Sequence, residues 1–242
     1  MGTTTLLAET SALLSRAGPN VIAVDLDMHR GDLHYRLDVP LSRGDYTIAD
    51  LLPVLDEIDS RILGNALMKS PCGVFLLPSP SSASDADFID WSHIRRLLPA
   101  LAAECDYLLV DTPPAFNGVT RAAIDLVDSV VLVVTPEPAC LGGARKALDE
   151  IRRQQCSPAE IILLVNRSRG NADPLPPSDI EAFLDLAPAA ILSEDIPGCR
   201  KAENEGRLRV SVNSALSREM HAFITQLLKI RYRATIRRAA TS

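Results

Sequence analysis

The sequence predicts an α/β fold in three layers, with a mainly parallel sheet covered by helices on both faces. Short apolar runs rich in Val, Leu and Ile recur along the chain, as expected for strands buried on both faces. Segments with helical spacing separate these runs. This alternation is typical of right-handed β–α–β units and a parallel sheet.

The expected elements follow one another without an internal linker, so we expect one domain over residues 1–242. The predicted strands cover residues 20–27, 74–78, 107–111, 129–136, 160–167 and 189–192. The predicted helices cover residues 6–18, 46–55, 89–104, 119–127, 141–155, 179–186 and 216–238, the last in two parts. Residues 28–43 are expected to be irregular, and no strand precedes the first helix.

Composition excludes several classes of protein. Hydrophobic residues make up 47% of the 242 residues and charged residues 23%, which is ordinary for a soluble globular protein. The formal net charge of -6 argues against non-specific nucleic-acid binding by the body of the protein, and we expect no specific nucleic-acid partner. The five cysteines are dispersed, which favours a reducing compartment. No signal peptide or membrane-spanning apolar run is present, so we expect a cytoplasmic protein.

The segment YLLVDTPP at residues 107–114 organises the chain. Its apolar run reads as a central strand, and the two prolines prevent the strand from continuing because they lack an N–H. Asp111 therefore lies at the carboxyl end of a strand, where ligands bind in open α/β sheets. One interpretation is a carboxylate that holds Mg²⁺ near nucleotide phosphates, and the other is a turn or helix N-cap.

Three segments in order resemble a known family. They are GTTT at residues 2–5, which opens a helix, VDLD at residues 24–27, and LVDTPP at residues 109–114. Together they resemble the deviant-Walker P-loop ATPases of the MinD/ParA group, over nearly the whole chain. The segments DLDMHRGDL at 25–33 and VTPEP at 134–138 are most similar to its pilus-assembly branch, the CpaE/TadZ proteins.

The resemblance implies ATP and Mg²⁺ as cofactors. Gly2, Thr3, Thr4 and Thr5 stand where the family's phosphate-binding loop ends and its helix begins, which suits phosphate oxygens. Thr4 matches the hydroxyl that binds Mg²⁺, and Asp111 matches the carboxylate that holds the metal through water. The alternative for the threonines is a simple N-cap cluster.

The remaining site residues are also implied by the resemblance. Asp27 matches the catalytic residue that positions the attacking water, and Asp25 matches its partner near the metal. Asn166 and Arg167 match the pair that contacts adenine, and a turn at Pro197 borders the same pocket. The alternative for the two aspartates is to cap a turn, and the alternative for Asn166 and Arg167 is a strand-end turn.

The chain departs from the family pattern at its beginning. Thr3 stands where the phosphate-loop lysine belongs, and loss of that charge weakens binding and hydrolysis. The family's first strand, the upstream glycines of the loop and the receiver-like domain of related pilus proteins are absent. We therefore expect an N-terminally truncated chain, in which ATP hydrolysis is an open question.

Three functions compete. The first is a slow or impaired ATPase that, as a homodimer, positions or assembles a type IV/Flp pilus secretion machine with other secretion proteins. The second is a non-enzymatic localisation scaffold on the same fold. The third is an NAD-binding oxidoreductase, which suits the acidic residue after the second strand but gives the segment around Asp111 no role.

The carboxyl-terminal helix, residues 216–242, ends in a basic tail. From Lys229 onward the sequence contains four arginines and no acidic residue. One interpretation is an amphipathic helix that lies on an anionic membrane, so that the cytoplasmic protein is peripheral at the inner membrane. The alternative is a helix packed on the sheet with a frayed basic end.

Overall fold

The computed structural model describes residues 2–42, 44–153 and 160–240, and the side chains of the last helix as far as Leu228. The strands are β1 (Val21–Asp25), β2 (Met68–Lys69), β3 (Phe75–Leu77), β4 (Tyr107–Asp111), β5 (Ser129–Val134), β6 (Glu160–Ser168) and β7 (Pro188–Ser193). The longer helices are α1 (Thr3–Arg16), α6 (Trp91–Ala102), α7 (Gly118–Leu126), α8 (Pro138–Arg153), α9 (Pro177–Leu184), α10 (Ile196–Asn204) and α11 (Ala215–Ala240). Short elements are α2 (Leu33–Arg36), α3 (Ile48–Leu51), α4 (Ser60–Ala66), α5 (Ala83–Ala86), η1 (Leu52–Val54), η2 (Gly170–Ala172) and η3 (Arg209–Ser211).

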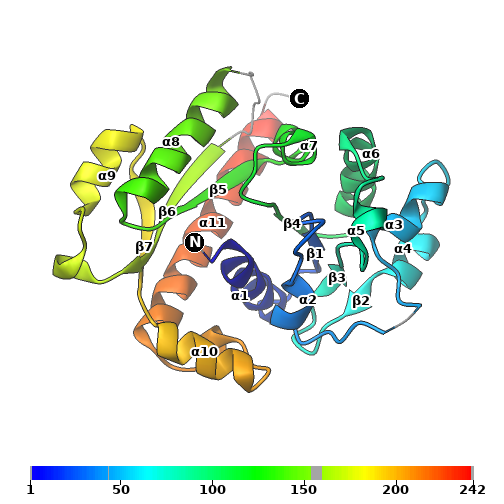
Figure 1. Cartoon of the computed structure of the whole chain (residues 1–242), viewed down its shortest axis with the longest axis horizontal. Coiled ribbons are helices and arrows are strands. Elements are labelled where there is room, and N and C mark those ends of the chain that lie inside the picture. Colours follow the sequence, from blue (N-terminus) through cyan, green and yellow to red (C-terminus); the bar gives the residue numbers. More distant parts are fainter. Residues whose placement is uncertain (1, 43, 154–159, 241–242) are drawn as a thin grey trace.

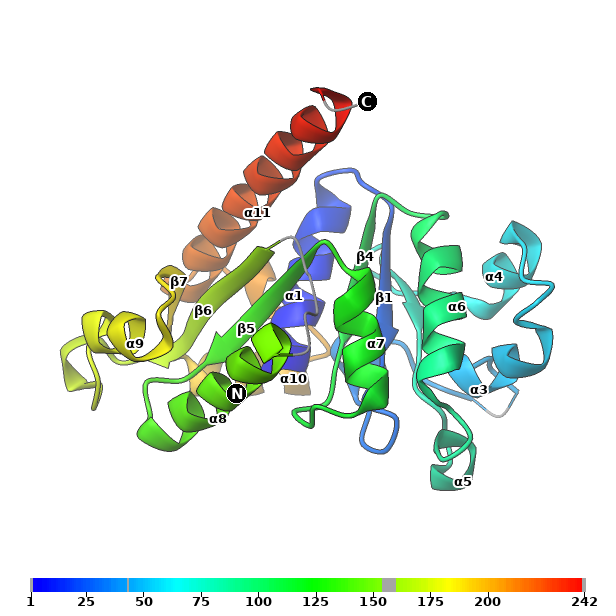
Figure 2. The same cartoon turned by 90° about the horizontal axis from the view of Figure 1, so that it is seen from above.

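The strands form two hydrogen-bonded sheets, one with the order β2-β3-β1-β4 and one with the order β5-β6-β7. All pairs are parallel except β2 with β3. Helices cover both faces of the two sheets (Figure 1, Figure 2). The predicted three-layer, mainly parallel α/β fold is therefore confirmed.

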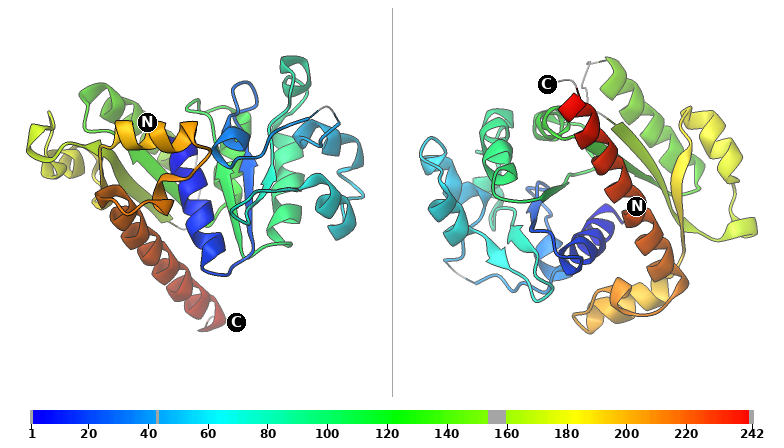
Figure 3. Two further views of the ribbon diagram at one scale, coloured as in Figure 1. Left: turned by 90° about the horizontal axis from the view of Figure 1, so that it is seen from below. Right: turned by 180° about the vertical axis from the view of Figure 1, so that it is seen from behind.

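Strand β1 shows why these layers form. All five of its residues are buried, because it has a neighbour on each side and a helix layer on each face. Ile22 and Val24 pack into the cluster that contains α6 and α7. Val21 and Ala23 face the other way, into the cluster that contains α1 and α11. Helix α11 packs against α1 and β7, and so covers the second sheet on that side (Figure 3).

Several predicted elements are wrong in detail. The helix predicted over residues 46–55 is only α3 followed by η1, and the segment 28–43 contains the short helix α2. The predicted last helix is one helix, not two parts. The side chains of the basic tail beyond Leu228 lie outside the described residues. The predicted amphipathic, membrane-binding face of the tail therefore stays a prediction.

The turn predicted at Pro197 is in fact the first turn of α10. Asp195 caps this helix by accepting a hydrogen bond from the Gly198 N–H at 3.0 Å. A proline is tolerated there because the first N–H groups of a helix have no partner inside it. Within the described part of the chain, no helix is long and apolar enough to cross a bilayer.

Candidate functional site

Helix α1 begins with free backbone donors at the carboxyl edge of the first sheet. Gly2 precedes it in the left-handed conformation, at a φ of 85°, and provides no side-chain cap. The first N–H groups of a helix have no acceptor inside it, and here no acidic side chain lies in the first turn. The amides of Thr3, Thr4 and Thr5 and the helix dipole therefore favour an anion in front of the helix.

The hydroxyl of Thr4 donates a hydrogen bond of 2.6 Å to Oδ2 of Asp111. Asp111 is the last residue of β4 and is 4% exposed. These two residues are 107 positions apart in the sequence, and the fold brings their side chains together. A hydroxyl and a carboxylate oxygen are ligands that suit Mg²⁺, which completes its octahedron with water and phosphate oxygens.

Asp25 lies beside Asp111, because the two residues are paired in the β1–β4 register. It is 1% exposed and accepts hydrogen bonds from the N–H groups of Asp27 at 3.0 Å and Leu33 at 3.1 Å. Asp25 thus holds the loop that follows β1 against the sheet, and it orients Asp27 through the backbone. Asp27 itself is half-buried at the site.

The site is acidic and raises the pKa of its own carboxyls. Burial raises the pKa of Asp25 to about 7, and the negative charges of Asp111 and Asp27 add to this shift. Burial likewise raises the pKa of Asp111 to about 6, against the hydrogen bond from Thr4. A divalent cation beside these carboxyls would favour their charged forms and so oppose both the burial and the repulsion that raise their pKa values.

Among the described residues, no group of three or more His, Cys, Asp or Glu side chains could bind a metal on its own. The two donors Thr4 and Asp111 suit a metal that arrives with phosphate oxygens, in the manner of Mg²⁺ in nucleotide sites. The residues therefore fit a Mg²⁺–nucleotide complex better than a free metal ion.

The second sheet brings an amide to the same edge. Asn166 lies near the end of β6 and is buried, and its Nδ2 is 3.2 Å from the position of a Cβ added to Gly2. Arg167 adopts a φ of 57°, is exposed, and donates its N–H to Oδ1 of Asn166 at 2.9 Å. Asn166 thus lies beside the start of α1, whereas Pro197 is exposed on α10.

Three residues at or behind the site, Asp32, Gly31 and Glu9, are not among the site residues that the sequence predicts. The negative charge of Asp32 contributes to the raised pKa of Asp111, so it belongs to the acidic site. A Cβ on Gly31 would lie 2.0 Å from Oγ of Ser79 and 2.5 Å from Oδ2 of Asp25, so the loop after β1 packs tightly there. The only sequence signal for Asp32 is its position directly before a short helix, where an aspartate is common.

Glu9 is the third such residue, and it fastens α1 to the far end of the chain. Its side chain is 6% exposed and accepts hydrogen bonds from the N–H groups of Arg209 at 2.6 Å and Val210 at 2.8 Å. Arg209 in turn pairs with Asp195, which caps α10. No local sequence pattern connects residues 200 positions apart.

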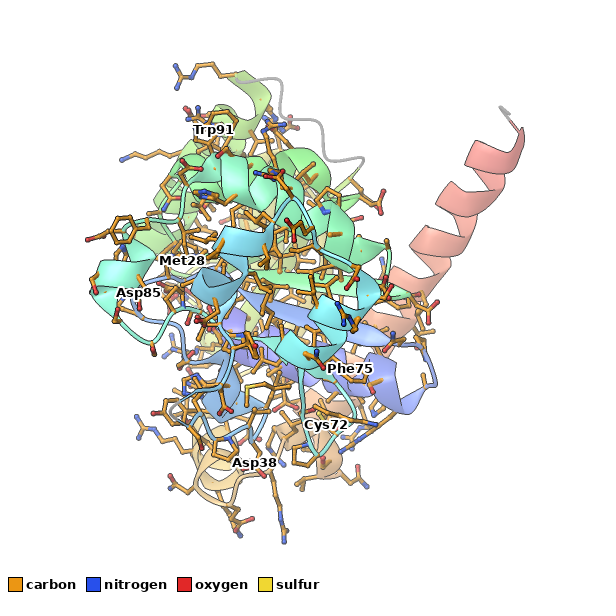
Figure 4. The ribbon with its side chains drawn as sticks, turned by 90° about the vertical axis from the view of Figure 1, so that its right-hand side faces the viewer. Met28, Asp38, Cys72, Phe75, Asp85 and Trp91 are labelled. Carbon is orange, nitrogen blue, oxygen red and sulfur yellow. The ribbon has the colours of Figure 1, made fainter. Side chains whose placement is uncertain are left out.

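Loops from several strands surround this edge. Met28 follows β1 and Asp85 lies in α5 after β3, and Figure 4 shows both on the same side of the molecule. The edge therefore collects the loops after β1, β3 and β4 with the start of α1. This is the place where α/β sheets bind their ligands.

Comparisons with known proteins agree with this geometry. A family model described as an AAA domain, AAA_31, matches residues 1–162. The septum site-determining protein MinD of Synechocystis is 27% identical over 169 residues, which are 70% of this chain and 61% of that protein. The chain thus spans less than two thirds of that relative's length.

Two solved structures share the fold. A ParA family ATPase from Chlorobium tepidum superposes with a TM-score of 0.83 at 21% identity, and the match covers 93% of each chain. MinD from Pyrococcus horikoshii, solved in complex with Mg-ADP, superposes with a TM-score of 0.81 at 23% identity, over 95% of this chain and 92% of that one. The chain has the fold of these ParA and MinD proteins, and it belongs to the AAA_31 family of AAA domains.

Proposed function

We propose that the chain binds ATP as its Mg²⁺ complex at the carboxyl edge of its sheets and acts as a nucleotide-dependent positioning protein. The observation that carries the proposal is the 2.6 Å hydrogen bond between Thr4 and Asp111 at the uncapped start of α1. It supports the proposal because a hydroxyl and a carboxylate that could bind Mg²⁺ then lie beside helix amides without a side-chain cap, an arrangement that suits a metal-bound phosphate.

The phosphates take the place in front of α1. The backbone N–H groups of Thr3, Thr4 and Thr5, with Gly2 allowing close approach, donate to phosphate oxygens. Mg²⁺, when bound, neutralises charge on those oxygens, and Thr4 and Asp111 orient it. Burial of Asp111 keeps it in one position for this task.

Hydrolysis would depend on Asp27. The backbone N–H of Asp27 donates a hydrogen bond to Asp25, and this contact positions Asp27 at the site. The carboxylate of Asp27 then orients the attacking water and accepts a proton from it. Thr3 provides no positive charge where the family has a lysine, so turnover is slow. Asn166 and Arg167 hold the adenine, and the start of α10 at Pro197 borders the base.

The cellular role proposed is in a type IV/Flp pilus secretion machine. Support comes from the segments 25–33 and 134–138, which resemble the CpaE/TadZ branch. The protein would act as a cytoplasmic homodimer with other secretion proteins, and the basic tail after Lys229 would attach it to the inner membrane surface.

A non-enzymatic scaffold is the second candidate, and the acidic site favours it. Four aspartates, at positions 25, 27, 32 and 111, interact electrostatically there, and Thr3 replaces the lysine. Such a protein would bind nucleotide weakly and form its assembly without it. Phosphate release separates the two candidates, because only the ATPase produces phosphate.

Calorimetric titration of the protein with Mg-ATP tests binding. We expect saturable heat from the unaltered protein, loss of that heat in Asp111→Asn, and no change in the matched control Asp149→Asn, which alters an exposed aspartate on α8. Equal titration curves for both variants would refute the assignment of Asp111. Absence of heat from the unaltered protein would leave the scaffold as the better account.

A further inference from the structure

The guanidinium of Arg36 lies between two carboxylates from distant parts of the chain. Its Nη2 donates to Oδ2 of Asp32 at 2.9 Å, and its Nε donates to the same oxygen at 3.3 Å. On its other side, Nη1 is 2.9 Å from Oε1 of Glu203 on α10. Only 25% of the Arg36 side chain is exposed, whereas Asp32 is 40% and Glu203 is 50% exposed. Two acidic side chains therefore share one half-buried cation.

The Asp32 side of this contact belongs to the acidic edge of the first sheet. Asp32 is followed by Leu33, whose N–H donates to Oδ2 of Asp25 at 3.1 Å. The carboxylate of Asp32 does not cap α2, so its contacts are with Arg36. Burial raises the pKa of Asp111, and the negative charge of Asp32 adds to this shift. A cation that enters beside Asp111 therefore also acts on Asp32 and on the guanidinium paired with it.

The Glu203 side belongs to α10, whose two ends are attached to different parts of the molecule. At its start the helix is capped by Asp195. Near its end Glu203 contacts Arg36, and a Cβ added to Gly206 would lie 3.5 Å from Oδ1 of Asp38. Asp38 lies just beyond α2 in the sequence. The last turn of α10 therefore lies against α2, and Arg36 connects the two helices by an ion pair.

The two carboxylates compete for the guanidinium. An arginine side chain stays protonated in proteins, so Arg36 carries one positive charge throughout the working range of pH. A second cation on the Asp32 side attracts that carboxylate and repels the guanidinium, and both effects weaken the pair of Asp32 with Arg36. The pair of Arg36 with Glu203 then becomes stronger. Because solvent screens partly exposed ion pairs, the change in a local equilibrium is a few-fold.

We propose that Arg36 is a positioning residue that couples a metal beside Asp111 to the attachment of α10. Without metal, Arg36 divides its contacts between Asp32 and Glu203. With Mg²⁺ beside Asp111, the guanidinium moves toward Glu203 and holds the last turn of α10 more firmly on α2. Since Pro197 of the same helix borders the proposed base position, metal binding steadies that border. The inference rests on the proposed function, because it requires Mg²⁺ and a nucleotide at this edge.

Hydrogen–deuterium exchange of the α10 amides, followed by mass spectrometry, tests the proposal. Exchange is measured with ADP and Mg²⁺ and with ADP and a chelator, at concentrations that calorimetry shows to be saturating. We expect Mg²⁺ to slow exchange over residues 199–204 about threefold in the unaltered protein. Arg36→Gln and Glu203→Gln should abolish this difference. Arg200→Gln, which alters an exposed arginine on the same helix, should preserve it.

The variant Asp32→Asn separates the proposed coupling from a purely structural contact. It removes the charge that competes with Glu203, so Arg36 should pair with Glu203 even without Mg²⁺. We therefore expect slow exchange in α10 with the chelator and no further slowing with Mg²⁺. A contact that only supports the fold would give faster exchange when Asp32 is replaced.

Calorimetry distinguishes failure of this proposal from failure of the proposed function. If ADP and Mg²⁺ bind but exchange in α10 is equal with and without Mg²⁺, the coupling is refuted and the proposed function is unaffected. A Mg²⁺ effect that persists in Glu203→Gln, or faster exchange in Asp32→Asn, would also overturn the role of Arg36. If ADP does not bind at all, the proposed function is refuted and this proposal with it.

Discussion

The four-stranded sheet ends in carboxylates, Asp25 on β1 and Asp111 on β4, whereas the three-stranded sheet ends in the amide of Asn166 and the guanidinium of Arg167. The carboxylates are buried and carry raised pKa values, while Arg167 is exposed. Carboxylates attract a metal cation, which in turn binds phosphate oxygens. An amide can donate and accept hydrogen bonds at the edge of a base. Under the proposed function, the comparison divides the site into two parts, which we call the metal half (the carboxylates) and the base half (Asn166 and Arg167).

Helix α1 joins the two halves. Thr4 bonds to Asp111 on one side, and Gly2 lies against Asn166 on the other. Glu9 then fixes the same helix to η3, ahead of α11. A nucleotide placed at the start of α1 therefore contacts both sheets, and changes in each half are expected to have different consequences.

The largest effect is expected in the metal half. Asp27→Ala removes the group that orients water, so we expect phosphate release to fall about a hundredfold while Mg-ATP still binds. A colorimetric phosphate assay beside a binding titration measures both, with Asp149→Ala as the control. Unchanged release from Asp27→Ala would exclude a catalytic role for this residue.

Glu9 tests the junction between the halves. Glu9→Ala leaves the buried N–H groups of Arg209 and Val210 without their acceptor, so we expect a loss of about 2 kcal/mol in the free energy of unfolding. Urea unfolding followed by circular dichroism measures it. Glu57→Ala, at an exposed position, is the control. A loss no greater than the control's would show that Glu9 does not hold the two regions together.

The base half is expected to give a smaller and more selective effect. Asn166→Ala removes the amide beside Gly2, so we expect about tenfold weaker binding of Mg-ATP and a smaller change for Mg-GTP. Competition titrations with the two nucleotides measure the ratio. Equal losses for both nucleotides would mean that Asn166 supports the phosphate position rather than the base.

Features of the site that depend on local sequence are easier to predict than features that depend on contacts between distant segments. Thr4, Asp25 and Asp111 follow from the sequence because each stands where a strand ends or a helix begins, and parallel strands bring such ends together. The division into two sheets, the bond of Glu9 to Val210 and the charge of Asp32 at the site depend on contacts between distant segments. Short elements such as α2 and α4 lack enough turns to give a period.

The raised pKa values give the smallest expected effect, a dependence on pH. The usual pKa of an aspartate is below 4, and in the folded protein Asp25 and Asp111 have pKa values of about 7 and about 6. Between about pH 4 and the folded pKa of each group, its carboxyl is protonated in the folded state but has lost that proton in the unfolded state. The metal-free protein should therefore lose stability as pH rises from about 4 to about 7.

Bound Mg²⁺ displaces those protons, so the affinity for Mg-ATP should rise over the same range. Urea midpoints at several pH values, for the unaltered protein and Asp111→Asn, check this prediction. The variant should show a flatter decline because one of the two titrating groups is gone. A midpoint that rises between pH 5 and pH 7 would contradict the assigned direction.

The most direct test of the metal half is the affinity for ADP, measured once with Mg²⁺ and once with a chelator. We expect Mg²⁺ to tighten binding to the unaltered protein about tenfold or more, and to have little influence on Asp111→Asn. If Mg²⁺ changes neither affinity, Thr4 and Asp111 do not hold a metal, and the division of this edge into a metal half and a base half is wrong.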